Sequence, residues 1–159
     1  MNTLHIIHQA LFGGVAAVGF AVLFNCKPRM LPLCFNAGTL ALAIRTIGQE
    51  NGLTLAISSF FAALVLAVVD RVWAGVSTPR GSVLAVLGAI PMVPGSIAAK
   101  VFMSVFIVLR FGHVANPEAI TATWENMIML IFTLAAIGTG LALPSLVFPA
   151  VKAPGKGHA

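Results

Sequence analysis

Charged residues are scarce in this sequence, and their scarcity excludes a water-soluble domain. Only 8% of the 159 residues are Asp, Glu, Lys or Arg, whereas 59% are hydrophobic. The mean hydropathy is correspondingly high, at +1.02. A chain of this composition has too little polar surface to stay in water, so we expect an integral membrane protein whose spanning segments lie in the lipid bilayer.

The groups that enzymes and metal sites need are also missing. The four acidic residues form no pair within an apolar segment, no nucleophile stands beside a base, and there is no Gly-rich phosphate loop. The only two cysteines, Cys26 and Cys34, form no group with histidines at metal-ligand spacing. We therefore expect no catalytic residues, no metal and no cofactor.

A basic excess is present, but its pattern is not that of a nucleic-acid-binding protein. Nine Lys and Arg against four Asp and Glu give a net charge of +5, yet the cations stand singly at the ends of apolar runs without interleaved aromatics. This placement indicates membrane topology and predicts no nucleic-acid partner. The segment Met1–His8 has no basic region, and no small-residue cleavage site precedes a soluble domain, so we expect no cleavable signal peptide.

The separate apolar runs predict an all-α membrane protein with five transmembrane helices in one domain, residues 1–151. About 20 residues suffice for a helix to cross a hydrocarbon core of about 30 Å. The predicted helices cover residues 4–24, 30–47, 53–70, 82–110 with a break near 91–95, and 117–148. Residues 152–159, rich in Gly, Pro and Lys, are expected to form a disordered cytoplasmic tail.

Turn and cap residues separate these helices. The segment Gly48–Gly52 predicts a tight loop directly after the second helix, whose end is placed near Arg45. Asn116, Pro117 and Glu118 supply an N-cap, a proline at the first helical position and an acid in the first turn, which predicts the start of the fifth helix.

Small residues recur at four-residue spacing on the first and last helices. Gly13, Ala17 and Ala21 form one such stripe, and Ala136 and Gly140 form another. Small side chains let a second helix approach closely in a membrane. These stripes support one interpretation of the whole chain, namely a scaffold subunit that assembles with a transporting partner and stabilises it.

Two histidines lie one turn apart near the start of the first helix. His5 and His8 are the only titratable side chains of that helix. We interpret them as polar residues of the membrane interface, in preference to a metal or proton site.

The fourth apolar run contains the most unusual segment, in which Pro91, Pro94 and Gly95 precede Lys100. Proline lacks a backbone donor and clashes with the preceding turn, so the two prolines predict a helix break, and glycine can adopt the angles that restart a helix. Unbroken, residues 82–109 would extend over roughly 42 Å, more than the hydrocarbon requires. The run is therefore either one interrupted crossing or a re-entrant pair.

The distribution of basic residues favours one interrupted crossing. With five crossings, most cations fall on one side: Lys27, Arg29, Arg71, Arg80, Lys152 and Lys156. Only Arg45 and Arg110 then lie opposite. Because cytoplasmic loops collect Lys and Arg, this count predicts an N-terminus outside and a C-terminus in the cytoplasm. The re-entrant pair stays open as the alternative.

Lys100 is the only charge within the fourth run, about 15 Å from its outer boundary by helical rise. A cation near the bilayer centre costs roughly 2.5 to 3.5 kcal/mol on insertion scales, and such residues usually face a cavity or an opposite charge. All four acids are predicted at membrane boundaries, and snorkelling reaches only a few ångströms. The counter-charge must then come from another chain, from a substrate or from loss of the proton.

A substrate anion fits this position. A half-helix that starts near Gly95 points its free N–H groups and positive dipole into the membrane, and Ser96 lies one turn before Lys100 on the same face. Discontinuous helices of this kind recur in secondary transporters. We predict that Gly95, Ser96 and Lys100 bind substrate, the alternative being a structural kink with Lys100 paired to a partner subunit. The membrane-proximal acids Asp70 and Glu125 are candidates for proton coupling or for interface anchoring.

Several segments together resemble the threonine/serine exporter family. They are Gly19–Asn25 followed by a basic turn with Arg29, Leu31–Leu33 with Gly38, and Ile90–Ser96. The match covers most of the chain and is similar to the small-subunit type, in which the five-helix C-terminal half of the full-length exporter exists as a separate protein.

The resemblance implies a bacterial inner-membrane exporter of small carboxylates: threonine, serine or a dicarboxylate such as succinate. It also implies a larger partner subunit with a soluble domain and five more helices. The family often has an arginine where Ala99 and Lys100 stand, and lysine keeps the charge but loses the planar fork. Besides the scaffold subunit, a homo-oligomeric channel with a ring of Lys100 side chains is an alternative.

Overall fold

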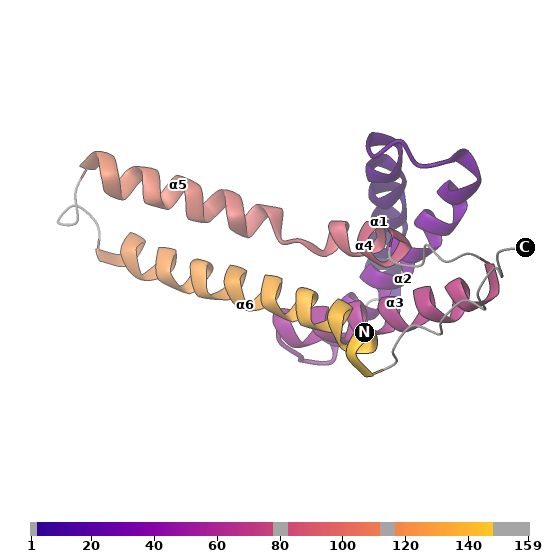
Figure 1. Ribbon diagram of the computed structural model, residues 1–159. Helices are drawn as coiled ribbons and strands as arrows, with labels where there is room; N and C mark the ends of the chain where they lie inside the picture. Colours follow the sequence, from indigo (N-terminus) through magenta and orange to yellow (C-terminus); the bar gives the residue numbers. More distant parts are fainter. Residues whose placement is uncertain (1–2, 78–82, 112–116, 148–159) are drawn as a thin grey trace, which may run out of the picture.

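The computed structural model describes residues 3–77, 83–111 and 117–147, and every regular element in these ranges is a helix (Figure 1). The elements are α1 (Thr3–Leu23), the 3-10 turn η1 (Pro28–Met30), α2 (Leu31–Glu50), α3 (Leu55–Ser77), α4 (Val83–Ala89), the 3-10 turn η2 (Ile90–Met92), α5 (Gly95–Phe111) and α6 (Pro117–Val147). The all-α prediction is confirmed for these residues. The predicted cap Asn116 and the predicted tail lie outside the described residues.

Four helices are long and apolar enough to cross a membrane: α1, α2 together with η1, α3 and α6. A fifth crossing results if α4–η2 and α5, which meet at a bend of 53°, are counted as one span. The described residues therefore support a multi-pass membrane protein with four to five spanning helices.

Two helices extend beyond their predicted ends. α2 continues to Glu50, and α3 continues to Ser77 through Asp70 and Arg71. The continuation of α3 follows from local chemistry, since no proline interrupts the sequence before Pro79. For α2, the extra turn places Arg45 well inside the helix and not at its end.

Left-handed residues end the first two helices. Asn25 has φ 55°, a conformation that Asn tolerates, and Gly52 has φ 83°, which suits glycine. At the second of these turns, the backbone N–H of Leu53 donates to the carbonyl of Gly48 at 3.0 Å. The predicted tight loop is thus a glycine-capped turn that brings α3 back beside α2.

The first small-residue stripe packs inside the chain. Gly13, Ala17 and Ala21 are buried, and α1 lies against α2. A Cβ atom placed on Gly38 of α2 would lie 2.5 Å from both the Cβ of Ala17 and the carbonyl oxygen of Gly13. The close approach of α1 and α2 therefore depends on the missing side chain at this position.

The second stripe is also used internally, between α6 and α3. A Cβ atom on Gly140 would lie 2.7 Å from the carbonyl oxygen of Phe60 and 2.9 Å from the Cβ of Ala63. Both stripes that the scaffold interpretation assigned to a partner thus contact helices of the same chain.

An alanine-rich core forms where α2, α3, α4, η2 and α6 meet. Its fully or almost fully buried members include Ala41, Ala63, Leu66, Ala89 and Met92. Small side chains allow these helices to pack closely. The core holds η2, with the helix break beside it, against α2.

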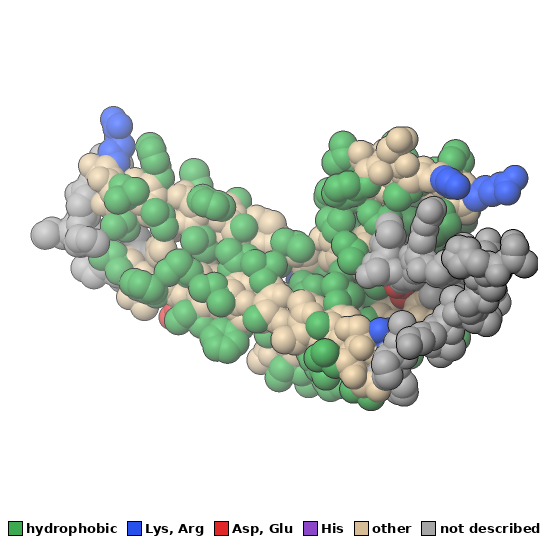
Figure 2. All heavy atoms as spheres, viewed as in Figure 1, with side chains coloured by type: hydrophobic (Ala, Val, Ile, Leu, Met, Phe, Trp, Pro, Cys, Tyr) green, Lys and Arg blue, Asp and Glu red, His purple; other side chains and the backbone are tan. Residues whose placement is uncertain are grey.

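α5 and the N-terminal part of α6 stand apart from this core, whereas Ile137 of α6 belongs to it. Figure 1 shows the two helices side by side, leading away from the remaining helices, and α5 packs chiefly on α6. Large hydrophobic side chains of the pair are exposed, among them Phe102, Met103, Phe106, Ile131 and Phe132 (Figure 2). This surface suits lipid or another protein, and not water.

Candidate functional site

The helix break lies between Ala89, the last residue of α4, and Gly95, the first of α5. After η2, Val93 is extended with ψ 124°, as expected for a residue that precedes proline. The carbonyl oxygen of Pro94 accepts hydrogen bonds from the N–H groups of Ile97 (3.1 Å) and Ala98 (3.0 Å). The break therefore leaves the N-terminus of α5 at Gly95, the position at which the sequence predicted a new half-helix.

Arg45 reaches this break from α2. Its Nη1 donates a hydrogen bond of 2.6 Å to the carbonyl oxygen of Met92, at the end of η2. The side chain is half-buried, and the two residues are 47 positions apart in the chain. A permanent cation therefore stands at the break.

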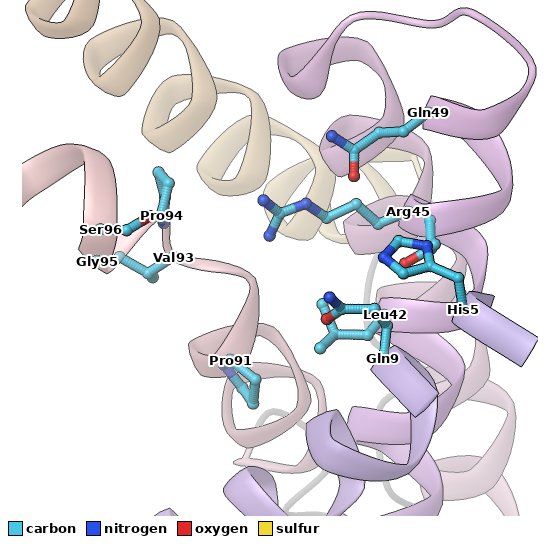
Figure 3. A pocket seen from close by; sticks show the side chains of 11 residues that line it. His5, Gln9, Leu42, Arg45, Gln49, Pro91, Val93, Pro94, Gly95 and Ser96 are labelled. Atoms are coloured by element: carbon cyan, nitrogen blue, oxygen red, sulfur yellow. The ribbon is translucent and has the colours of Figure 1, made fainter. Parts of the chain in front are cut away.

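A cavity of about 250 Å³ lies between the break and the ends of α1 and α2. One wall consists of His5 and Gln9 from α1 with Leu42, Arg45, Thr46 and Gln49 from α2, and the other of Pro91, Val93, Pro94, Gly95 and Ser96. Figure 3 shows Gln9, Arg45 and Gln49 on one side and the Pro94–Ser96 segment on the other. Its lining contains hydrogen-bonding side chains and a cation, but no acidic residue.

The N-terminus of α5 supplies further donors to the cavity. Among the hydrogen bonds of the described residues, none engages the backbone N–H or the hydroxyl of Ser96. Both Gly95 and Ser96 are exposed to the cavity side. Unsatisfied N–H groups and the positive end of a helix dipole attract anions, and a guanidinium opposite them adds a full charge.

Lys100 lies elsewhere. It is exposed on α5, one turn beyond Ser96, and it is not among the residues that line the cavity. No ion pair joins it to another residue in the described part of the chain. The structure thus brings Gly95 and Ser96 together with Arg45, while the substrate-binding role of Lys100 stays a prediction.

Sequence reasoning missed Arg45 because it placed the end of the second helix too early. Arg45 is the only charged residue of the mainly apolar segment 40–47, which was a signal for a charge inside a span. The partner of that charge, a backbone carbonyl 47 residues away, has no signature in the sequence.

The two candidate coupling acids are both outside this cavity. Asp70 is 6% exposed on α3, and its carboxylate is hydrogen-bonded to the backbone of Ala85 in α4. Glu125 is exposed on α6, beside a second, mainly apolar cavity of about 350 Å³ that Leu55 and Phe132 also line. The buried side chain of Asp70 therefore links α3 to α4, whereas the carboxylate of Glu125 lies on the surface.

The two histidines of α1 have different surroundings. The Nδ1 atom of His5 lies 3.5 Å from Oε1 of Glu50 at the end of α2, and His5 also lines the cavity. His8 packs on Phe12 with ring centroids 4.5 Å apart, away from the cavity lining. Only one of them can contact a molecule bound at the break.

Comparison with known proteins points to one family. The family model described as "Threonine/Serine exporter, ThrE" matches residues 9–147. An uncharacterized protein of Haemophilus influenzae is 31% identical over 145 residues, which cover 91% of this chain and 48% of the relative. The chain thus spans about half the length of this curated relative. No solved structure matches it.

Proposed function

Since the chain belongs to the threonine/serine exporter family, we propose that it exports small carboxylates as part of a secondary transporter. The observation that carries the proposal is the half-buried guanidinium of Arg45, which stands at the helix break in a cavity shared with the N-terminus of α5. The proposed substrates are threonine, serine or a dicarboxylate such as succinate.

The cavity offers a carboxylate three kinds of attraction. The guanidinium can donate two parallel hydrogen bonds to it, the N–H of Ser96 and the dipole of α5 favour negative charge, and the hydroxyl of Ser96 adds another donor. In the structure Arg45 donates a hydrogen bond to the carbonyl of Met92. A carboxylate is the stronger acceptor, so its arrival would draw the guanidinium from the break toward the substrate.

The remaining polar lining suits the rest of a small, hydroxylated molecule. Gln9, Thr46 and Gln49 present amide and hydroxyl groups that can donate to or accept from a substrate hydroxyl, and an amide oxygen can accept from an ammonium group. The volume of about 250 Å³ is at the small end for ligand cavities, which fits a molecule of amino-acid size.

We place the chain in the bacterial inner membrane, with the N-terminus outside and the C-terminus in the cytoplasm, and count α4, η2 and α5 as one interrupted crossing. The start of α1 and the end of α2 both border the cavity. In this orientation they lie at the outer side, so the cavity faces the outside, where an exported substrate leaves.

We further propose that a larger membrane subunit, with a soluble domain, completes the transporter. Two observations support a partner: the chain spans 48% of the length of its relative, and the α5–α6 pair exposes large apolar side chains. Lys100 would then meet its counter-charge in the substrate or in that subunit. The small-residue stripes no longer support a mere scaffold, because they pack within this chain.

The test replaces Arg45 in cells that carry the chain in its native genetic background, so that any partner is present. Arg45→Gln should reduce export of labelled threonine, serine or succinate at least about tenfold, because a charged hydrogen bond is lost. Arg45→Lys should recover part of the rate. Lys27→Gln, which removes an exposed cation at the other end of α1 and α2, is the matched control.

Equal export by the Arg45→Gln and Lys27→Gln variants would show that Arg45 does not bind the transported carboxylate. Membrane levels of each variant, measured by immunoblot, separate loss of transport from loss of protein.

A further inference from the structure

We propose that His5 is a second ligand-binding group of the Arg45 cavity, held in place by Glu50, and that its protonation strengthens anion binding. This inference rests on the proposed function, because it concerns the same cavity. It assigns a proton-binding role to His5, which the sequence alone indicated to be a polar residue of the membrane interface.

One ring nitrogen of His5 has a partner in the structure. Its Nδ1 lies 3.5 Å from Oε1 of Glu50, while the residue lines the cavity together with Arg45. Figure 3 shows the imidazole on the α1 side of the cavity, near the base of the Arg45 side chain. A carboxylate at one nitrogen orients the ring and leaves the other, Nε2, available to a ligand.

The charges around His5 decide what its protonation does. From α2, the neighbouring charged groups are Glu50 and Arg45, and α1 itself contributes the neutral Gln9 to the lining. Neither α4, η2 nor the Pro94–Ser96 segment contains a titratable side chain. Glu50 pairs with His5 but does not line the cavity. A protonated His5 therefore adds a second positive charge to a cavity whose lining contains no acidic residue.

Anion binding and proton binding are therefore linked. If a bound carboxylate favours the protonated ring, the proton must favour the bound carboxylate to the same degree. The cavity would hold its substrate together with a proton and release it more readily as the pH rises.

The neighbouring histidine provides a matched control. His8 lies on the same helix three residues later, but its ring packs on Phe12 and does not line the cavity. A histidine-to-glutamine change at either position removes one titratable group from α1 and keeps an amide of similar reach. Only the change at His5 should alter the response of ligand binding to pH.

The experiment measures binding of labelled L-threonine at pH 5.5 and pH 7.0 to the chain purified from its native background together with any partner and placed in lipid nanodiscs. The threonine carboxylate is ionised at both values, so the ligand keeps its anionic group. Wild-type affinity should be about three- to tenfold higher at pH 5.5, the size expected for one added, partly exposed charge. His5→Gln should bind equally at both pH values, and His8→Gln should keep the wild-type ratio.

Glu50→Gln tests the supporting carboxylate and should reduce the pH ratio, because the ring loses the group that orients it toward the cavity. A pH ratio in His5→Gln equal to that of the wild type overturns the inference. If Arg45→Gln still weakens binding in that case, the anion cavity of the proposed function stands. If Arg45→Gln binds threonine like the wild type at both pH values, the proposed function and this inference both fail.

Discussion

The α1–α2 pair and the α5–α6 pair are both antiparallel and apolar, but they differ in where their polar side chains lie. In the first pair, His5, Gln9, Arg45 and Gln49 face one cavity, and glycines bring the two helices into close contact. In the second pair, Lys100 is exposed and large hydrophobic side chains point outward. The first pair thus gathers polar side chains around a cavity, whereas the second leaves its mid-helix cation outside the lining.

Each pair also contributes one cation near the helix break, which makes the two cations comparable. Arg45 lines the cavity and bonds to Met92, while Lys100 lies one turn outside the lining. By charge alone, Arg45 and Lys100 would be equally able to bind an anion. Their different positions relative to the cavity distinguish them, and substitutions can test whether this difference matters for transport.

The largest effect is expected from Lys100→Ala, which should abolish export while the protein stays folded and assembled. The exposed side chain contributes little to packing, but a cation in an apolar helix needs a counter-charge, which the substrate would supply. Export from preloaded cells and co-purification of any partner would be measured together. Normal export would show that Arg45 alone supplies the charge, and loss of co-purification would assign Lys100 to the partner interface.

A smaller effect, on stability, should separate the packing of the two pairs. Gly38→Ala forces a methyl group against the backbone of Gly13 and should destabilise the fold by about 1–3 kcal/mol. Gly138→Ala on α6 meets nothing within 4 Å and should be neutral or slightly stabilising, because alanine is the better helix former. Unfolding in mixed detergent micelles measures both. Similar behaviour of the two variants would mean that α1 and α2 do not approach as closely as described.

The smallest effect concerns the two acids. Asp70→Ala should cost about 1–3 kcal/mol of stability, because it removes the acceptor of a buried hydrogen bond between α3 and α4. Glu125→Ala should leave stability unchanged, since that side chain is exposed. Thermal unfolding compares the two variants. An Asp70→Ala protein that is fully stable yet exports nothing would instead identify Asp70 as a coupling residue.

Several local features could be predicted from the sequence because single residues decide them. Pro91, Pro94 and Gly95 constrain their own backbone, so the change from α4 to α5 falls among them. α6 begins at Pro117, a residue suited to the first position of a helix. Gly52 has the positive φ that a tight loop after α2 requires.

The helix ends that lacked such residues were placed less well. α2 and α3 both run beyond their predicted ends, since charged residues such as Arg45, Asp70 and Arg71 are compatible with a helix and do not terminate it. A charged residue indicated a membrane boundary, but a charged side chain does not end a helix. Proline does so, because it restricts the backbone and lacks the N–H group.

The sequence by itself determined a multi-pass helical membrane protein, its family and the position of the helix break, because composition, apolar length and proline geometry act locally. Only the tertiary structure decided that Arg45 stands at that break, that His5 and Glu50 meet beside it, and that Asp70 ties α3 to α4. Each of these contacts joins elements far apart in the chain, and their distances depend on how closely glycine and alanine let the helices approach.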